Sequence, residues 1–182
     1  VILENQLLIW LGKRKMENSV SKLKGHYVIC GFGRMGKQLF ASLVDRNVEV
    51  VVIDRDEENV ERLMEDGYFA IFGDATEDSV LERAGVSRAS GLATVLGSDA
   101  ENLYVVLSAT MLNPDMQIIS RASQESASTK LYRAGATQVV SPFKAGAAKM
   151  KQFMVNPKAA ELVDWFSAGG VDFELSEYNI DK

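Results

Sequence analysis

Side chains that perform catalysis or form cross-links are scarce in this 182-residue chain. It has one cysteine, Cys30, and one histidine, His26. A single cysteine excludes an internal disulfide, and Cys30 lies inside an apolar run, where an inert buried thiol is expected rather than a reactive one. The sequence has no zinc-ligand spacing, no G-x-S-x-G elbow and no P-loop. We therefore assign no residue a catalytic or metal-binding role.

Long apolar runs are absent too, and the charge is unevenly spread. The apolar stretches fall far short of the roughly 20 residues that cross a bilayer. The net charge of −5 argues against nucleic-acid binding. Residues 1–24 hold five basic and two acidic side chains, a charge of +3, so the remainder carries −8. A basic arm is typical of the cytoplasmic side of a membrane segment, and a solvated charged helix explains it equally well.

Short β-branched apolar runs alternate with stretches typical of helices. Their nearly continuous apolarity predicts strands covered on both faces, as in a parallel sheet. Strands are expected at 27–31, 48–54, 68–74, 91–97, 116–122 and 137–141, and helices at 34–46, 56–66, 77–84, 99–111 and 124–133. The order predicts an α/β fold: a Rossmann-like, doubly wound, six-stranded parallel sheet with right-handed crossovers.

The two ends lie outside this sheet. We predict a linker helix in residues 1–24, the sheet domain in 25–141, and crossover helices in 142–182 that lead into a truncated C-terminal subdomain. The first residue is not Met, so a longer parent chain is expected. Pro157 is predicted to open a helix and residues 171–178 to begin a strand. Leu8, Ile9 and Trp10 fit either the end of a preceding helix or a dimer contact.

Local signals mark several helix ends. Ser98 and Glu101 have the spacing of a capping box. Thr76 is predicted to cap the helix that begins at Glu77. A left-handed C-cap favours glycine, and the glycines that follow predicted helices are Gly67, Gly85 and Gly135.

The first predicted strand leads into a G-x-G-x-x-G motif, typical of dinucleotide-binding sites. Gly31 allows a tight turn, Gly33 lets a pyrophosphate approach the backbone, and Gly36 lets the helix pack closely on the strand. The helix N-terminus offers amide groups and a favourable dipole to phosphates. The alternative is a Rossmann-like sheet whose glycines serve packing alone.

An acid ends the second strand, 18 residues after Gly36. Asp54 is placed to accept hydrogen bonds from both ribose hydroxyls and to repel a 2′-phosphate, which favours NAD or another adenine nucleotide over NADP. Arg55 acts in the opposite sense, because its guanidinium can pair with such a phosphate.

Further candidates lie at the ends of the other strands. Asp74 fits either hydrogen bonding to adenine or local backbone contacts. Arg34 and Arg121 are the candidate phosphate cations, with Arg121 preferred because it ends an apolar strand. The acids at this edge suit Ca²⁺ or Mg²⁺, but their spacing matches no metal loop. The candidate binding residues are Gly31, Phe32, Gly33, Arg34, Met35, Gly36, Asp54, Arg55, Asp74, Ala75, Gly97, Ser98, Asp99 and Arg121.

Five stretches resemble the RCK/KTN domain, the nucleotide-binding regulatory domain of potassium channels and transporters. They are HYVICGFGRMG (26–36), VVVIDRDEE (50–58), GDATEDSVLERAGV (73–86), GLATVLGSDAENLYVVLSA (91–109) and LYRAGATQVVSPFKAGAAKM (131–150). GDAT and GSD-x-x-N are more specific than the glycines. The segment GKRKMENSVSKLKGHYVICG looks like a linker from a channel's pore helix. The stretch 120–123 lacks the acids that bind Ca²⁺ in some members of the family.

The resemblance implies a non-enzymatic cytoplasmic domain of an inner-membrane potassium channel. It further implies an NAD or adenine-nucleotide ligand (ADP, ATP or AMP) and homodimers that assemble into a gating ring. Three alternatives stay open: a fragment of an NAD-dependent oxidoreductase, a freestanding regulatory subunit of a potassium transporter, and an assembly domain with an empty cleft. The only histidine precedes the first strand, at the wrong edge for acid–base work on a nucleotide.

Overall fold

The computed structural model describes residue 12 and residues 14–155. The chain divides into two compact units at Pro142. The first unit contains, in order, β1 (Tyr27–Cys30), α2 (Arg34–Val44), β2 (Val50–Asp54), α3 (Glu57–Glu65), β3 (Phe69–Phe72), α4 (Asp78–Arg83), the 3₁₀ turn η1 (Val86–Arg88), β4 (Gly91–Thr94), α5 (Asp99–Leu112), β5 (Gln117–Arg121), α6 (Glu125–Ala134) and β6 (Gln138–Val140). All the strands and helices predicted for residues 25–141 are confirmed, with ends shifted by a few residues.

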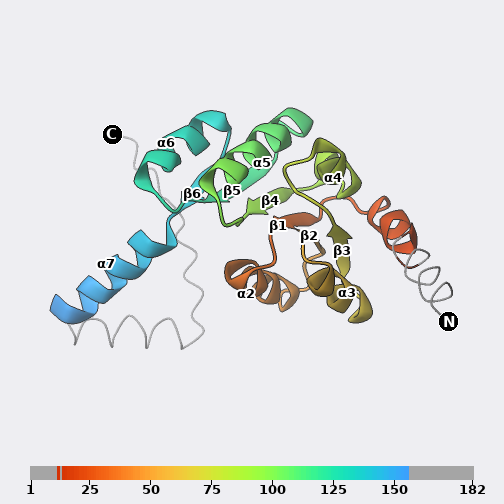
Figure 1. The fold of residues 1–182 in the computed structure, drawn as a ribbon, viewed down its shortest axis with the longest axis horizontal. Helices are drawn as coiled ribbons and strands as arrows, with labels where there is room; N and C mark the ends of the chain where they lie inside the picture. The colour runs from red at the N-terminus through yellow and green to blue at the C-terminus, as the bar shows by residue number, and fades with distance from the viewer. Residues whose placement is uncertain (1–11, 13, 156–182) are drawn as a thin grey trace, which may run out of the picture. The chain divides into compact units, whose positions relative to one another are not determined.

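The six strands form one sheet in the order β3-β2-β1-β4-β5-β6, and every neighbouring pair is parallel (Figure 1). This order is that of the dinucleotide-binding Rossmann fold. The chain reverses direction across the sheet between β1 and β4. Ligands of open α/β sheets bind at this switch point, outside the carboxyl ends of the strands.

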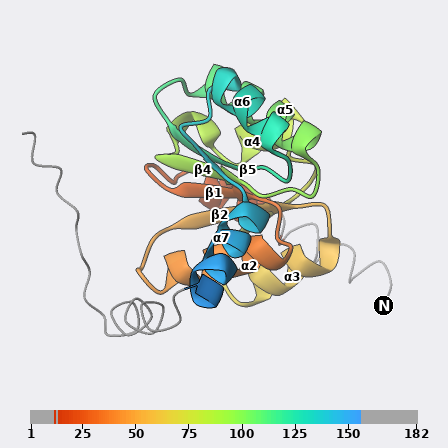
Figure 2. The ribbon, with the colours of Figure 1, turned by 90° about the vertical axis from the view of Figure 1, so that its left-hand side faces the viewer.

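Helices lie on both sides of the sheet (Figure 2). The central strands β1, β2 and β4 are nearly completely buried, as strands covered on both faces should be. The prediction that every strand is covered in this way is wrong for β5 and β6, because these two strands alternate between exposed and buried or half-buried residues. On one face α2 and α3 bury a cluster that includes Ile29, Phe40 and Val60. On the other face α4, α5 and α6 bury a larger cluster that includes Leu81, Val105 and Leu131. The two clusters clamp β1 and β2 from opposite sides and thereby fix the carboxyl edge that carries the candidate site.

Helix caps are partly as predicted. Gly67, Gly85 and Gly135 have positive φ angles of 84°, 72° and 114°, which confirms the left-handed C-terminal turns. Ser98 is the N-cap residue of α5, as predicted, but the side-chain bonds of a capping box are absent, and the N-cap of α4 is Glu77 rather than Thr76. Ser98 makes no side-chain capping bond, and the carboxylate of Glu101 binds Arg55 instead. Helix α4 begins one residue later than expected, and the hydroxyl of Thr76 donates to Asp74 at 2.7 Å.

Within the first unit, the segment that precedes β1 packs on the sheet domain. Residues 14–20 are helical, and the side chains of Val20 and Leu23 are buried in the larger core cluster. Arg83 of α4 forms an ion pair with Glu17 at 2.6 Å. The side chain of Arg88 donates to the Leu23 carbonyl at 3.2 Å. The linker is therefore held by the α4–η1 segment, whose other end leads back to β3.

The second unit begins with α7 (Pro142–Val155), which confirms a helix after the sheet. None of its residues is buried. The predictions for Pro157, for residues 171–178 and for Leu8, Ile9 and Trp10 lie outside the described residues. Within the described part of the chain, no helix combines the length and apolarity that a membrane span requires.

Candidate functional site

The glycine turn between β1 and α2 has the geometry that the motif predicts. Gly31 has a φ of 100°, a region that favours glycine. A Cβ on Gly36 would lie 2.0 Å from the Gly31 carbonyl oxygen, so only glycine lets α2 pack this closely on the turn. A Cβ on Gly33 would meet no atom within 4 Å. The fold therefore requires Gly31 and Gly36, whereas Gly33 faces open space where a phosphate can approach.

Asp54 ties the end of β2 to this turn. One carboxylate oxygen accepts a hydrogen bond from the Phe32 amide, and the other accepts from the Asp56 amide at 2.7 Å. The side chain is partly exposed at the sheet edge. It is thus held beside the glycine turn, and each carboxylate oxygen retains a lone pair that can accept a further hydrogen bond.

Arg55 is held by two acids from other elements. Its Nη2 donates to Asp74 Oδ2 and its Nη1 to Glu101 Oε1, both at 2.7 Å. Burial would raise the pKa of Asp74, but hydrogen bonds from Arg55 and Thr76 outweigh it and lower this pKa to about 2. Asp74 is therefore ionised at neutral pH. Asp74 therefore bonds both to its neighbour Thr76 and to Arg55, which is distant in sequence, and Arg55 is paired with two carboxylates.

Asn102 of α5 joins the ends of β4 and β5. The side chain is fully buried. Its Oδ1 accepts from the Thr94 hydroxyl at 2.7 Å and from the Leu96 amide at 3.0 Å, and its Nδ2 donates to the carbonyls of Leu96 and Arg121, both at 3.2 Å. In the sequence this asparagine stands in the GSD-x-x-N motif, from which no role for it was predicted. An amide side chain next to the apolar residues of α5 was the feature of the sequence that could have predicted a buried hydrogen-bonding role.

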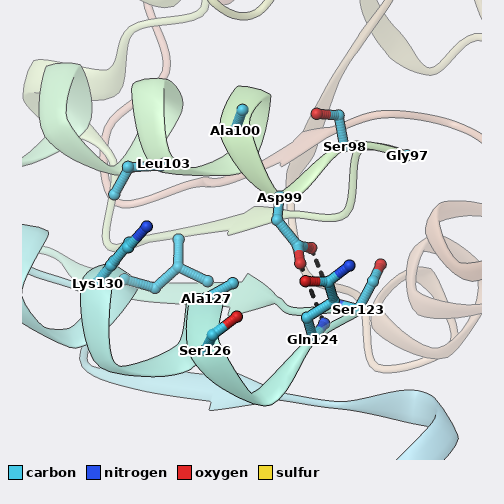
Figure 3. Close-up of a pocket in the computed structure, with 11 residues that line it drawn as sticks. Gly97, Ser98, Asp99, Ala100, Leu103, Ser123, Gln124, Ser126, Ala127 and Lys130 are labelled. Atoms are coloured by element: carbon cyan, nitrogen blue, oxygen red, sulfur yellow. Dashed lines mark hydrogen bonds between the residues drawn. The ribbon is translucent and has the colours of Figure 1, made fainter.

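Asp99 forms hydrogen bonds with the loop between β5 and α6. Its two oxygens accept from the amides of Ser123 and Gln124 at 2.7 and 3.1 Å (Figure 3). The carboxylate therefore satisfies amides at the start of α6, where negative charge is favourable. Beside it, a cavity of about 440 Å³ lies between α5 and α6, lined by Gly97, Ser98, Asp99, Ala100, Leu103, Ser123, Gln124, Ser126, Ala127, Lys130 and Leu131. Of the candidate residues, this cavity includes Gly97, Ser98 and Asp99.

The two candidate phosphate cations differ in setting. Arg34 is exposed at the first turn of α2. Arg121, at the end of β5, is partly buried, and its Nη2 donates to the Ser123 hydroxyl at 3.3 Å. Its Nε is buried and has no hydrogen-bond partner within the described part of the chain. A buried unpaired donor is costly, so an anion at this edge would satisfy it.

Candidate residues from separate strands are thus joined along one edge. Asp54 contacts the glycine turn, and Arg55 contacts Asp74. A Cβ on Gly31 would lie 3.0 Å from the Leu96 side chain, and Asn102 links Leu96 to Arg121. The chemical types of these groups suit an adenine nucleotide. The open turn at Gly33 and the unsatisfied Nε of Arg121 suit a phosphate, and the Asp54 carboxylate suits a ribose. Among the described residues, no three His, Cys, Asp or Glu side chains are grouped to hold a metal ion.

The remaining reactive groups lie away from this edge. Cys30 is fully buried, and burial raises the pKa of its thiol far above the usual range. His26 is also buried, and its Nε2 bonds to the Ala84 carbonyl at 2.9 Å. Burial lowers the pKa of His26 despite the Ala84 bond, so the ring is neutral at neutral pH. Both residues serve packing.

Several relatives of known sequence are proteins of potassium transport. Potassium channel protein 1 of Methanocaldococcus jannaschii is 38% identical over 167 residues, which cover 91% of this chain and 50% of that protein. The chain thus spans about half the length of this relative. The glutathione-regulated potassium-efflux system protein KefC of Enterobacter is 34% identical over 108 residues, 59% of this chain and 17% of that protein.

Solved structures share the fold. The TrkA-N domain of the inner membrane protein ybaL from Escherichia coli has a TM-score of 0.71 at 29% identity and covers 72% of this chain and 98% of that one. The GsuK channel bound to NAD has a TM-score of 0.60 at 28% identity, over 65% of this chain and 22% of that one. GsuK bound to ADP has a TM-score of 0.64 at 28% identity, over 81% and 39%.

The family model of the TrkA-N domain matches residues 27–142. The matched segment contains all six strands, the glycine turn, Asp54, the Arg55 pairs and Arg121, and it ends where the first compact unit ends. The likeness to the RCK/KTN domain that the sequence motifs indicated is thereby confirmed, and the chain belongs to the TrkA-N domain family.

Proposed function

We propose that this chain is the cytoplasmic nucleotide-sensing domain of a potassium channel, and that an adenine nucleotide of the NAD or ADP type is its regulatory ligand. The observation that carries the proposal is the glycine turn at the switch point of the sheet. Gly33 leaves room for a phosphate, and Asp54 lies at hydrogen-bonding distance from the Phe32 amide of the same turn.

In the proposed site, each part of the nucleotide is bound at the end of a different strand. Asp54 accepts from the ribose hydroxyls, and Asp74 and Ala75 lie where adenine would rest at the end of β3. The amides that open α2 and the guanidinium of Arg121 receive the phosphates. Gly31, Phe32, Gly33, Arg34, Met35 and Gly36 form the turn beneath them. Gly97, Ser98 and Asp99 bound the far side, toward β4.

A sensing role accords with the residues better than a catalytic one. A hydride-transfer enzyme requires an acid–base group positioned at the nucleotide. The single histidine is buried at the other edge, against Ala84. Among the similar solved structures, the GsuK channel was solved bound to NAD, and GsuK was also solved bound to ADP. The match to KefC keeps a transporter-regulating domain as the second candidate.

The packing of the linker suggests how binding would reach a pore. Asp74 lies at the start of the segment that continues through α4 to Arg83 and Arg88. These two arginines hold Glu17 and the Leu23 carbonyl of the linker. A ligand that binds one arrangement of domains tenfold more tightly than another contributes about 1.4 kcal/mol per site to the gating equilibrium.

The proposed function is tested by replacing Asp54 in the full-length protein. Asp54→Ala removes the acceptor for both ribose hydroxyls, and we expect the affinity for NAD⁺ and ADP, measured by calorimetry, to fall by about 1–3 kcal/mol, the range for a lost charged hydrogen bond. Single-channel currents of the parent should respond to the nucleotide, and those of Asp54→Ala should need a correspondingly higher concentration.

Asp45→Ala is the matched control, since Asp45 caps the end of α2 and lies outside the proposed site. It should bind nucleotide as the parent does. Unchanged affinity in Asp54→Ala would show that the ribose assignment is wrong. Currents that ignore NAD⁺, ADP and ATP at saturating levels would refute the gating role, while nucleotide-dependent turnover would favour an oxidoreductase.

We also propose that the chain assembles as a homodimer and, in the full-length protein, as a larger ring. Helix α5 supports this proposal, because it is apolar on nearly all sides and such helices are usually covered. Tyr104, Leu107 and Met111 recur at spacings of three and four, so they share a face, and they are 64%, 45% and 83% exposed in the single chain.

Charging this α5 face is expected to weaken self-association. Leu107→Glu would place a carboxylate in the proposed contact, and burying an unpaired charge there is costly. We expect the molar mass from light scattering to fall toward that of the monomer, with unchanged thermal stability of the monomer. Thr129→Glu, at an exposed position of α6, is the control for one added negative charge. An unchanged molar mass in Leu107→Glu would exclude this face.

A further inference from the structure

Arg55 is the basic residue that follows the proposed ribose-binding carboxylate, and in sequence terms it is the residue that could admit NADP. In Rossmann sites that accept a 2′-phosphate, an arginine near this position pairs with it. The structure shows Arg55 already engaged. Each of its two terminal nitrogens donates to a different carboxylate at 2.7 Å, one from Asp74 and one from Glu101.

We propose that Asp74 and Glu101 are specificity-determining residues, which withhold the Arg55 guanidinium from a 2′-phosphate and so select ligands with a free ribose 2′-hydroxyl. The inference rests on the proposed nucleotide site. It assigns a role to Glu101, whose spacing from Ser98 predicted a local helix cap, and it adds Asp74 and Glu101 to Asp54 as residues that select against a 2′-phosphate.

The charge balance around Arg55 supports this selection. Asp54 and Asp56 are linked through the Asp56 amide and adjoin Arg55 in the chain, and Asp74 and Glu101 bind its side chain. Four carboxylates against one guanidinium leave a local charge of −3. Because the pKa of Asp74 is lowered to about 2, this carboxylate stays charged at neutral pH. A 2′-phosphate would therefore meet a net negative surface.

The two acids come from opposite sides of the switch point, so their effect depends on the tertiary fold. Asp74 follows β3 on the outer half of the sheet, and Glu101 lies in the first turn of α5, after β4. The two pairs use two of the five N–H donors of Arg55 and fix the direction of its guanidinium. Turning it toward a 2′-phosphate would break these bonds and leave carboxylates beside the incoming dianion. Arg55 is about half exposed, so each pair contributes modestly, and substitutions should change specificity in measurable steps.

The test compares NAD⁺ with NADP⁺, which differ by the 2′-phosphate alone, in calorimetry on the full-length protein at one ionic strength. The parent should prefer NAD⁺. Glu101→Gln should raise the ratio of NADP⁺ affinity to NAD⁺ affinity about fivefold, the upper range for an exposed ion pair. Asp74→Asn should raise the same ratio, and any effect on adenine binding cancels because both ligands carry adenine.

Two further variants isolate the role of Arg55. Glu58→Gln removes a nearby acid that pairs with Arg62 rather than Arg55, and it should leave the ratio unchanged. Adding Arg55→Ala to Glu101→Gln should abolish the gain, because the gain depends on the released guanidinium. The inference is overturned if Glu101→Gln leaves the ratio within twofold of the parent, or if Glu58→Gln raises it equally. Failure of the parent to bind either ligand would instead refute the nucleotide site itself.

Discussion

Gly36→Ala is expected to lower the free energy of unfolding by about 2 kcal/mol or more. The new methyl group would lie 2.0 Å from the Gly31 carbonyl oxygen, so the turn or α2 must move. Overpacking of this kind typically costs about 1–3 kcal/mol and more when backbone obstructs the methyl. Alanine recovers about 1 kcal/mol of helix propensity, which is too little to compensate. Urea unfolding, read from the midpoint at constant slope, measures the change.

Gly33→Ala is the matched variant, since it adds the same methyl group three residues earlier, where nothing lies within 4 Å. Its stability should stay within about 1 kcal/mol of the parent, the cost of alanine in place of glycine at an N-cap. Its affinity for NAD⁺ and ADP should fall at least about tenfold, because the methyl occupies the space in which a phosphate would approach the backbone.

This pair of variants separates fold from function. A stable Gly33→Ala protein that binds nucleotide as well as the parent would mean that the turn serves packing alone, and the proposed site would be wrong. A Gly36→Ala protein as stable as the parent would contradict the close approach of α2 to the turn. Gly146→Ala, in α7, adds a methyl in equally open space outside the sheet, so it should leave nucleotide affinity unchanged and raise stability by at most about 1 kcal/mol through helix propensity.

Asn102→Ala is expected to destabilise the protein by about 3 kcal/mol. The side chain is fully buried and makes four hydrogen bonds, to the Thr94 hydroxyl, the Leu96 amide, and the carbonyls of Leu96 and Arg121. Truncation leaves those groups without their partner in a buried setting, and each unsatisfied group costs about 1–3 kcal/mol before relaxation or entry of water. Thermal and urea unfolding measure the loss.

Asn59→Ala controls for the loss of an amide as such. Asn59 makes a single contact of 3.3 Å with Asp56 at the surface, and its removal should change stability by less than about 0.5 kcal/mol. If Asn102→Ala were as mild as Asn59→Ala, the network between β4 and β5 would be energetically unimportant. A second consequence concerns the site, because the loss of the Asn102 bond to the Arg121 carbonyl should also weaken nucleotide binding.

The sequence by itself was sufficient to predict the sheet and its carboxyl edge. Apolar β-branched runs of strand length, separated by amphipathic helices, leave few alternatives to a parallel sheet covered on both faces. The glycine spacing predicted the turn, and the positive φ of Gly31 confirms it. The position of Asp54 could also be predicted, because the last residue of a parallel strand lies at the carboxyl edge of the sheet.

Local reasoning failed where one side chain had both a near and a distant partner. Ser98 and Glu101 have capping-box spacing, yet Glu101 binds Arg55, which is 46 residues away in sequence. An exposed capping contact contributes little more than an exposed ion pair, so sequence spacing does not decide between them.

Thus the sequence determined that acids and arginines would gather at one edge of a nucleotide-binding type of sheet. The tertiary structure alone decided how they pair. Arg55 is held by Asp74 and Glu101, Asp99 is directed to the start of α6, and the Nε of Arg121 is left buried without a partner among the described residues. The spacing of apolar residues predicts which face of a helix or strand is buried. The hydrogen-bond partners at the sheet edge depend instead on which loops the strand order brings together.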